Sequence, residues 1–131
     1  SWGADSVVLV SHYPVISRRR EALADGWKYS GDALRLDGLA DELAARPAPT
    51  ILLHGHLHLG DAVARGSYLQ LGFPALAESG RHAAVVEIAQ DGDELDVIVT
   101  PIPTSSDECL PSAIGEPTRH WRCSGGEWQS G

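Results

Sequence analysis

The stretches ILLHGHLH (residues 51–58) and VVLVSHYP (residues 7–14) decide the predicted fold. Each begins with a short continuous run of apolar residues, which is typical of a strand buried on both faces. In each stretch, histidine follows at or just after the end of the apolar run. The sequence therefore predicts two buried strands whose carboxyl ends present imidazole side chains.

A helix is predicted between these two strands. Ser30 and Asp32 are good N-cap residues, and Pro47 ends the helical pattern. Between these positions, apolar residues recur at helical spacing and predict one buried face: Leu36, Leu39, Ala40, Leu43 and Ala44. A strand–helix–strand unit of this kind almost always joins parallel strands. The carboxyl ends of both strands, and the histidines that follow them, are then expected at one edge of the sheet.

Antiparallel strands are predicted after the histidines. Alternating or apolar runs occupy residues 67–71, 83–89 and 94–100. The Asp91-Gly92 pair between the last two runs is a strong hairpin signal. Residues 1–103 are therefore expected to form an α/β fold in which a β-α-β unit is followed by antiparallel strands.

The composition separates residues 104–131 as a tail rich in Ser, Pro, Gly and charged residues. The tail contains a weaker hairpin pattern over residues 120–129 and both cysteines, Cys109 and Cys123. One pair of cysteines is too few for a disulfide scaffold. The two are expected either as ordinary thiols or as a single bridge that staples the tail. This cysteine usage favours a cytoplasmic protein.

Length and charge exclude several classes of protein. The 131 residues, of which 43% are hydrophobic, suffice for one ordinary domain with a core. No run approaches the ~20 apolar residues of a membrane span. The net charge of −8 argues against non-specific nucleic-acid binding, which depends on neutralising phosphates. The charge is typical of a soluble protein whose functional site is made locally positive by bound cations.

The Gly-His-x-His segment at residues 55–58 is the strongest chemical signal in the sequence. Neutral imidazoles are good ligands for Zn, Fe and Mn, and the glycine lets the backbone turn tightly beside a metal. With the upstream histidine expected at the same edge, the sequence predicts a metal site made by His12, His56 and His58. Because ligating histidines must be deprotonated, metal affinity is expected to fall on acidification. A polar loop in which histidines occur by chance is the alternative.

The other candidate residues carry weaker signals. His54 lies at a strand end and is expected to pack structurally or to support a metal ligand from behind, whereas His82 and His120 are expected at the surface. Tyr13 and Arg18 are candidate substrate contacts, because both follow the first predicted strand and a guanidinium group matches a phosphate in geometry. A solvated turn before a short helix is the alternative for Arg18 and the two arginines that follow it.

The chain resembles the calcineurin-like metallophosphoesterases. The stretch VLVSHYP, residues 8–14, resembles the strand-then-histidine motif of that family, and LLHGHLH, residues 52–58, resembles its Gly-His-x-His signature. The resemblance implies a two-sheet αββα sandwich with two divalent metal ions (Mn, Fe or Zn) at the sheet edge. It implies that His12 and His56 bind one metal ion and that His58 binds the other. The implied activity is hydrolysis of a phosphate mono- or diester by a metal-activated water.

The chain departs from the family pattern upstream of its Gly-His-x-His segment. The family has Asp-x-His, Gly-Asp-x-x-Asp and Gly-Asn-His motifs there, and none of them precedes Gly55. The resemblance, which covers residues 7–103, therefore implies the C-terminal half of a catalytic domain. No catalytic residue is assigned within this half, which is expected to hydrolyse phosphoesters poorly by itself. Its expected partners are a phosphoester substrate and the missing half, from the same gene product or another chain, which would cover an exposed sheet edge.

Two other functions compete with this prediction. The first is a non-catalytic phosphoesterase-like module that binds a metal weakly and serves as an interaction surface. The second is a small structural zinc domain in which the three histidines and a fourth ligand close around one ion. A metal pair with a bridging carboxylate would favour the enzyme, whereas unfolding on chelation would favour the structural domain.

Overall fold

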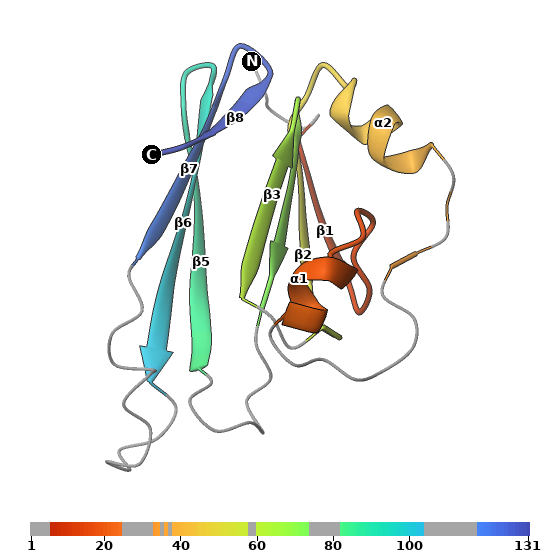
Figure 1. Cartoon of the computed structure of the whole chain (residues 1–131). Coiled ribbons are helices and arrows are strands. Elements are labelled where there is room, and N and C mark those ends of the chain that lie inside the picture. Colours follow the sequence, from red (N-terminus) through yellow and green to blue (C-terminus); the bar gives the residue numbers. More distant parts are fainter. Residues whose placement is uncertain are drawn as a thin grey trace.

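The computed structural model describes residues 6–24, 33–34, 36, 38–57, 60–73, 82–103 and 118–131. Figure 1 shows the helices and strands in chain order. Within the described residues they are β1 (Val7–Ser11), α1 (Arg19–Ala24), α2 (Leu39–Ala44), β2 (Thr50–His54), β3 (Asp61–Arg65), β4 (Tyr68–Gly72), β5 (His82–Asp91), β6 (Glu94–Pro103), β7 (Arg119–Ser124) and β8 (Glu127–Ser130).

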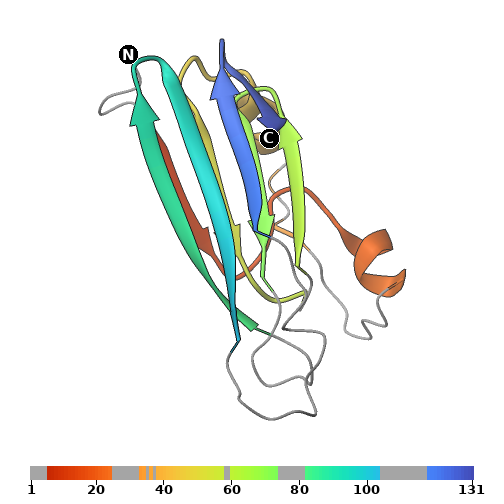
Figure 2. The ribbon, with the colours of Figure 1, turned by 90° about the vertical axis from the view of Figure 1, so that its left-hand side faces the viewer.

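The strands form two four-stranded sheets, which we call sheet A and sheet B. Sheet A has the order β1-β2-β4-β3, in which β1, β2 and β4 are parallel and β3 is antiparallel to β4. Sheet B has the order β5-β6-β7-β8 and is antiparallel throughout. The sheets lie face to face, and α1 and α2 lie on the outer side of sheet A (Figure 1, Figure 2). The chain therefore has the mixed α/β content that the sequence predicts.

Apolar side chains from both sheets fill the space between them. Because successive residues of a strand point to opposite faces, Ile51 of β2 points toward sheet B, whereas Leu52 packs with Tyr68 and Leu43 on the helix side. Both faces of β2 are thus buried, as predicted. The buried members of the cluster between the sheets are Ile51, Leu69, Leu71, Leu95, Val97, Val99, Trp121, Cys123 and Trp128.

The strand β1 is less buried than the sequence predicts. The predicted strand over residues 7–10 is confirmed, and so is its parallel pairing with β2. The prediction that it is buried on both faces is wrong, because Val8 is 49% exposed, Leu9 37% and Val10 81%. The reason is its place in the sheet: β1 is an edge strand, and among the described strands it pairs with β2 alone.

The helix before β2 is shorter than the sequence predicts. It begins at Leu39, directly after Gly38, whose φ of 77° belongs to the left-handed region and interrupts the helical pattern. Leu43 is buried as predicted, but Leu36 lies before the helix and is 56% exposed. The predicted caps Ser30 and Asp32 lie outside the described residues. A glycine at the start thus sets a boundary that apolar spacing did not reveal.

Both predicted hairpins are present. Asp91 pairs with Glu94 across the turn between β5 and β6, where Gly92 has a φ of 59°. β7 and β8 pair across Gly125 and Gly126, which also have positive φ. In contrast, β3 was not predicted, because its sequence DAVAR offers only a short alternation. Among the described residues, no helix is long and apolar enough to cross a lipid bilayer.

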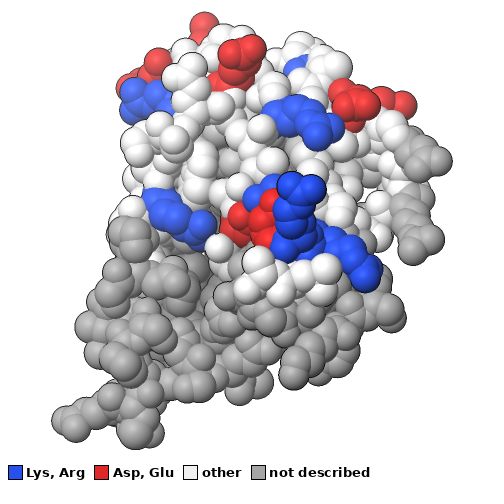
Figure 3. Space-filling view, viewed as in Figure 1, with Lys and Arg blue, Asp and Glu red and all other residues white. Residues whose placement is uncertain are grey.

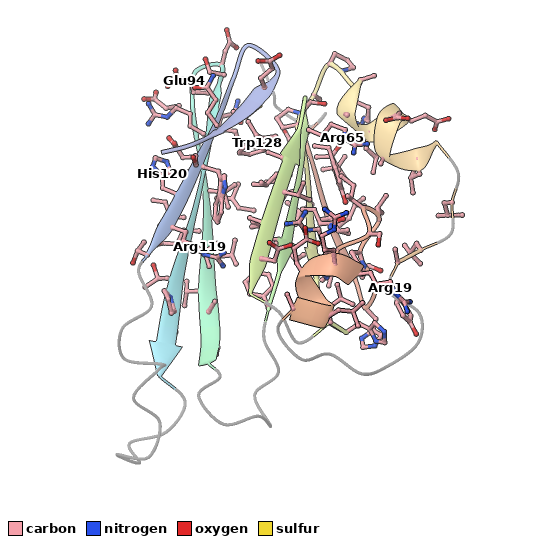
Figure 4. The ribbon with its side chains drawn as sticks, viewed as in Figure 1. Arg19, Arg65, Glu94, Arg119, His120 and Trp128 are labelled. Atoms are coloured by element: carbon pink, nitrogen blue, oxygen red, sulfur yellow. The ribbon has the colours of Figure 1, made fainter. Side chains whose placement is uncertain are left out.

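The β7–β8 hairpin packs with the rest of the chain. The indole N–H of Trp128 donates to the backbone oxygen of Ser67 at 3.0 Å, and its backbone N–H donates to that of Gly66 at 3.1 Å. Figure 4 shows Trp128 between β8 and sheet A. The hairpin within the predicted tail therefore belongs to the common core. Cys123 is a buried free thiol, and Cys109 lies outside the described residues.

Candidate metal centre

His12 and His56 meet at the carboxyl ends of β1 and β2. Ser11 pairs with His54 in the parallel register, so the residues that follow the two strands emerge side by side. The Nδ1 atom of His56 lies 3.1 Å from the Nε2 atom of His12, and the ring centroids are 4.8 Å apart. The structure thus brings together two of the three predicted ligands. His58, the third, lies outside the described residues.

The backbone of His56 is strained. Its φ is 63°, and it is the one residue other than glycine with positive φ in the described part of the chain. The N–H of Leu57 donates to the oxygen of Gly55 at 2.8 Å, which closes a three-residue γ-turn around His56. A γ-turn with positive φ is the rarer, strained form, and such outliers cluster at functional sites, where the surrounding structure maintains them. This outlier falls on one of the two residues whose rings meet.

Tyr13 packs against both imidazoles. Its ring centroid lies 5.0 Å from that of His12, edge to face, and 4.3 Å from that of His56. Its backbone N–H donates to the Oγ of Ser11 at 3.3 Å. The side chain is 38% exposed, so it restrains the rings on one side and meets solvent on the other. Its role as a substrate contact stays a prediction, now with a position beside the two histidines.

His54 is buried and turned toward the protein. It is 4% exposed, and its Nδ1 lies 3.0 Å from the oxygen of Gly55. Burial lowers the pKa of His54 below its usual value, because the charged imidazolium is poorly solvated there. The ring is therefore neutral at pH 7, which is the state required of a histidine that supports a ligand or packs in a core.

Arg18 is engaged by carboxylates. Its Nε and Nη2 atoms donate to the two oxygens of Asp61 at the start of β3, the latter at 3.1 Å, and its Nη1 lies 3.3 Å from Glu21. The hydrogen bond that Arg18 donates to Asp61 raises the pKa of Arg18. Figure 3, which has the same view as Figure 1, shows acidic and basic side chains in contact near the middle of the face toward the reader. Contact between Arg18 and a substrate phosphate would require this ion pair to open. The sequence predicted no role for Asp61, because the Gly60-Asp61 pair lacks the follower and the position of the Gly-Asp-x-x-Asp motif.

Of the two other histidines, His120 lies away from the pair. His120 is on the outer side of sheet B, where its Nε2 lies 2.5 Å from the Oδ1 of Asp96 (Figure 4). The side chain of His82, the first residue of β5, lies outside the described part. Within that part, no group of three or more His, Cys, Asp or Glu side chains is placed to hold a metal ion.

One match to a family motif is fortuitous. The letters of Gly-Asp-x-x-Asp occur at residues 92–96, which form the β5–β6 turn and the start of β6. There Asp96 accepts hydrogen bonds from Arg122 at 2.8 and 3.1 Å and lies beside His120. These carboxylates belong to sheet B, whereas the two imidazoles belong to sheet A.

Comparisons of the chain with protein-family models, with curated proteins and with solved structures found no match.

Proposed function

We propose that this chain is the C-terminal half of a calcineurin-like metallophosphoesterase domain. It would hydrolyse a phosphate mono- or diester once the missing half, from the same gene product or from another chain, completes the metal site. His12, His56 and, outside the described residues, His58 are the ligands that this chain would supply. The two facing sheets and the helices outside sheet A would form part of an αββα sandwich.

The approach of the two imidazole nitrogens carries the proposal. Two nitrogens bound to one zinc ion each lie about 2.0–2.1 Å from it, so at a tetrahedral angle they are about 3.3 Å apart. The 3.1 Å between the Nδ1 of His56 and the Nε2 of His12 is close to that spacing. Two neutral rings also reach this distance through an N–H···N hydrogen bond. A second observation must therefore distinguish a pair of metal ligands from a pair of hydrogen-bonded rings.

The strain at His56 is that second observation. A left-handed backbone costs a residue with a side chain about 1–2 kcal/mol, and a neutral hydrogen bond contributes only about 1 kcal/mol. The hydrogen bond between the rings therefore does no more than offset the conformation of His56. A metal ion bound by both rings would contribute far more, which makes a ligand role the better explanation of the turn.

The residues of this chain would hold and orient the site. In enzymes of this class, divalent ions supply an activated water and stabilise charge on the phosphate oxygens. His12 and His56 would bind a metal through the two nitrogens that now face each other. Tyr13 packs on both rings and limits their rotation. His54, kept neutral by burial, stabilises the turn by its contact with Gly55.

The exposed edge of sheet A supports the need for the missing half, whether it belongs to the same gene product or to another chain. Val8 lies beside Ile51 in the register, so it points toward sheet B, and Val10 points the same way. Both are largely exposed, and Ile88 of β5, on the same side of the molecule (Figure 2), is 41% exposed. An edge strand with exposed apolar side chains favours pairing with a further strand.

A non-catalytic binding module is the second candidate. The observation that favours it is the donor set, because no carboxylate joins the two imidazoles within the described part of the chain. Three imidazoles suffice for one zinc ion with water, but a bridged metal pair needs carboxylates. Such a chain would bind one ion and recognise a partner without hydrolysing phosphoesters.

Zinc binding measured by calorimetry tests the ligand assignment. Without the missing half, all three histidines are expected to bind one Zn²⁺ together. His12→Ala, His56→Ala and His58→Ala are therefore each expected to bind it at least about tenfold more weakly. His120→Gln, which changes a histidine on the outer side of sheet B, is the matched control and is expected to bind as the wild type does. Equal affinity in all five proteins would contradict the assignment.

Phosphate binding then separates the enzyme from the binding module. Inorganic phosphate is expected to bind the zinc-loaded chain and not the metal-free chain, because the ion supplies the positive charge. Failure of phosphate to bind the zinc-loaded chain would favour the non-catalytic module. Hydrolysis of p-nitrophenyl phosphate by residues 1–131 alone is expected to stay at background, and rapid turnover would show that the missing half is not needed.

A further inference from the structure

Gln70 occupies an unusual place for a polar residue. It lies in the middle of β4 and is 1% exposed. Its neighbours in the sheet are Leu52 on one side and Val63 on the other, both apolar. Moving an amide from water into an apolar environment where it makes no hydrogen bond costs several kcal/mol. A buried glutamine is therefore expected where its side-chain N–H and C=O groups are hydrogen-bonded.

The amide of Gln70 binds the loop that follows His12. Its Oε1 accepts hydrogen bonds from the backbone N–H groups of Val15 at 2.9 Å and Ile16 at 2.8 Å. Its Nε2 donates to the backbone oxygen of Ile16 at 2.9 Å. The hydroxyl of Tyr68 also donates to Oε1, at 2.9 Å. One side chain thus fixes three backbone groups of a loop 54 to 55 positions away in the sequence.

Only two residues separate His12 from this fixed segment. One is Pro14, which is buried, whose ring restricts φ, and whose oxygen accepts a hydrogen bond from the N–H of Leu34 at 2.8 Å. On the other side of His12, Ser11 is held by its pairing with His54. The backbone of His12 is therefore fixed at both ends, by strand pairing before it and by Gln70 after it.

We propose that Gln70 is a positioning residue for His12. By holding Val15 and Ile16 against the outer face of sheet A, it keeps the imidazole of His12 within reach of His56. The inference rests on the proposed role of these histidines as metal ligands and adds a residue that acts on them through the loop. In the sequence, the mark of this residue is a single polar position within the apolar run YLQLG.

The first test compares two core variants of similar expected stability. Gln70→Met removes the amide with little change in volume, and Val97→Ala opens a cavity in sheet B, where Val97 is fully buried. Zn²⁺ affinity from calorimetry is expected to fall at least about tenfold in Gln70→Met, as for other residues that orient ligands. Val97→Ala is expected to bind within about threefold of the wild type, because a general loss of stability does not move His12.

The second test needs no metal. In the metal-free chain, nuclear Overhauser contacts between the His12 and His56 rings are expected in the wild type and in Val97→Ala, and are expected to vanish in Gln70→Met. Hydrogen exchange at Val15 and Ile16 should accelerate in that variant alone. The proposal would be overturned if the ring contacts persisted in Gln70→Met while the backbone amides of Val15 and Ile16 exchanged rapidly.

The two tests fail separately. If the wild type binds no Zn²⁺, the proposed function fails, and the ring contacts still decide the role of Gln70. If Gln70→Met does not fold, Gln70→Glu replaces it: its carboxylate still accepts from Val15 and Ile16 but loses the donor to the Ile16 oxygen. That variant is expected to show weakened ring contacts, and wild-type contacts with fast exchange at Val15 and Ile16 would overturn the proposal.

Discussion

The Nδ1 atom of His56 lies 3.1 Å from the Nε2 atom of His12, although the two residues are 44 positions apart in the chain. The contact is a product of parallel pairing, because β1 and β2 end at the same edge of sheet A. Among the described residues, two short helices lie between these strands in the sequence. Two separate motifs thus form one candidate site, which no single segment of the chain defines.

The strain at His56 predicts an unusual order of stability among its variants. His56→Gly is expected to be more stable than His56→Ala by about 1 kcal/mol, because glycine takes a positive φ at little cost and alanine does not. Urea denaturation of the two variants gives the difference directly. Both lack the ring, so neither is expected to bind Zn²⁺ as the wild type does. An alanine variant as stable as the glycine variant would show that the turn is not strained.

The ion pair between Arg18 and Asp61 predicts a structural role for Arg18. Arg18→Ala is expected to lower the free energy of unfolding by about 1 kcal/mol, and a double-mutant cycle with Asp61→Ala should recover a coupling of that order. Arg19→Ala, which removes an exposed neighbouring arginine, is the matched control and is expected to be neutral. Equal free energies of unfolding for Arg18→Ala and Arg19→Ala would show that the ion pair between Arg18 and Asp61 does not form in solution.

The carboxylate of Asp96 predicts a pH-dependent contribution to stability. Hydrogen bonds from Arg122 and His120 hold its pKa below the usual value, so folding favours the ionised form. The contribution is therefore fully present above the ordinary aspartate pKa of about 4 and is lost as the pH falls through the lower folded value.

Melting temperatures of the wild type and Asp96→Asn between pH 2 and pH 7 measure this contribution. The difference should be largest at pH 5–7 and shrink below pH 4. A wild-type advantage that persists unchanged at pH 2 would contradict the assignment.

The position of Gly66 is predicted to tolerate no side chain. A Cβ atom there would lie 2.4 Å from the backbone oxygen of Ala44, and its φ is 52°. Gly66→Ala is expected to cost about 3 kcal/mol or more, the sum of the left-handed backbone and the clash with α2. Gly125→Ala has a similar φ of 61° with open space around it and should cost only about 1 kcal/mol in urea denaturation. Equal losses would show that α2 does not pack against this turn.

Local patterns in the sequence predicted the elements that depend on local chemistry. The Asp91-Gly92 turn, the β7–β8 hairpin and the strands β1 and β2 follow from residue spacing and turn residues. The meeting of His12 and His56 followed from the rule for parallel strands.

Features that depend on distant partners were not predictable in this way. Burial of β1 depends on what lies beyond the edge of sheet A, which apolar content does not reveal. Gln70 and Asp61 gain their roles from loops more than forty residues away in the sequence. The start of α2 depends on the left-handed conformation of Gly38, which apolar spacing ignores. Tertiary contacts, rather than propensity, decide these positions.

The proposed function requires that His12 and His56 bind the same metal ion. A crystal structure of the zinc-loaded chain, with anomalous data collected at the zinc edge, tests this requirement. An anomalous peak is expected about 2.0–2.1 Å from both the Nε2 of His12 and the Nδ1 of His56. A loaded crystal in which the zinc lies elsewhere, with the two rings still hydrogen-bonded to each other, would contradict it.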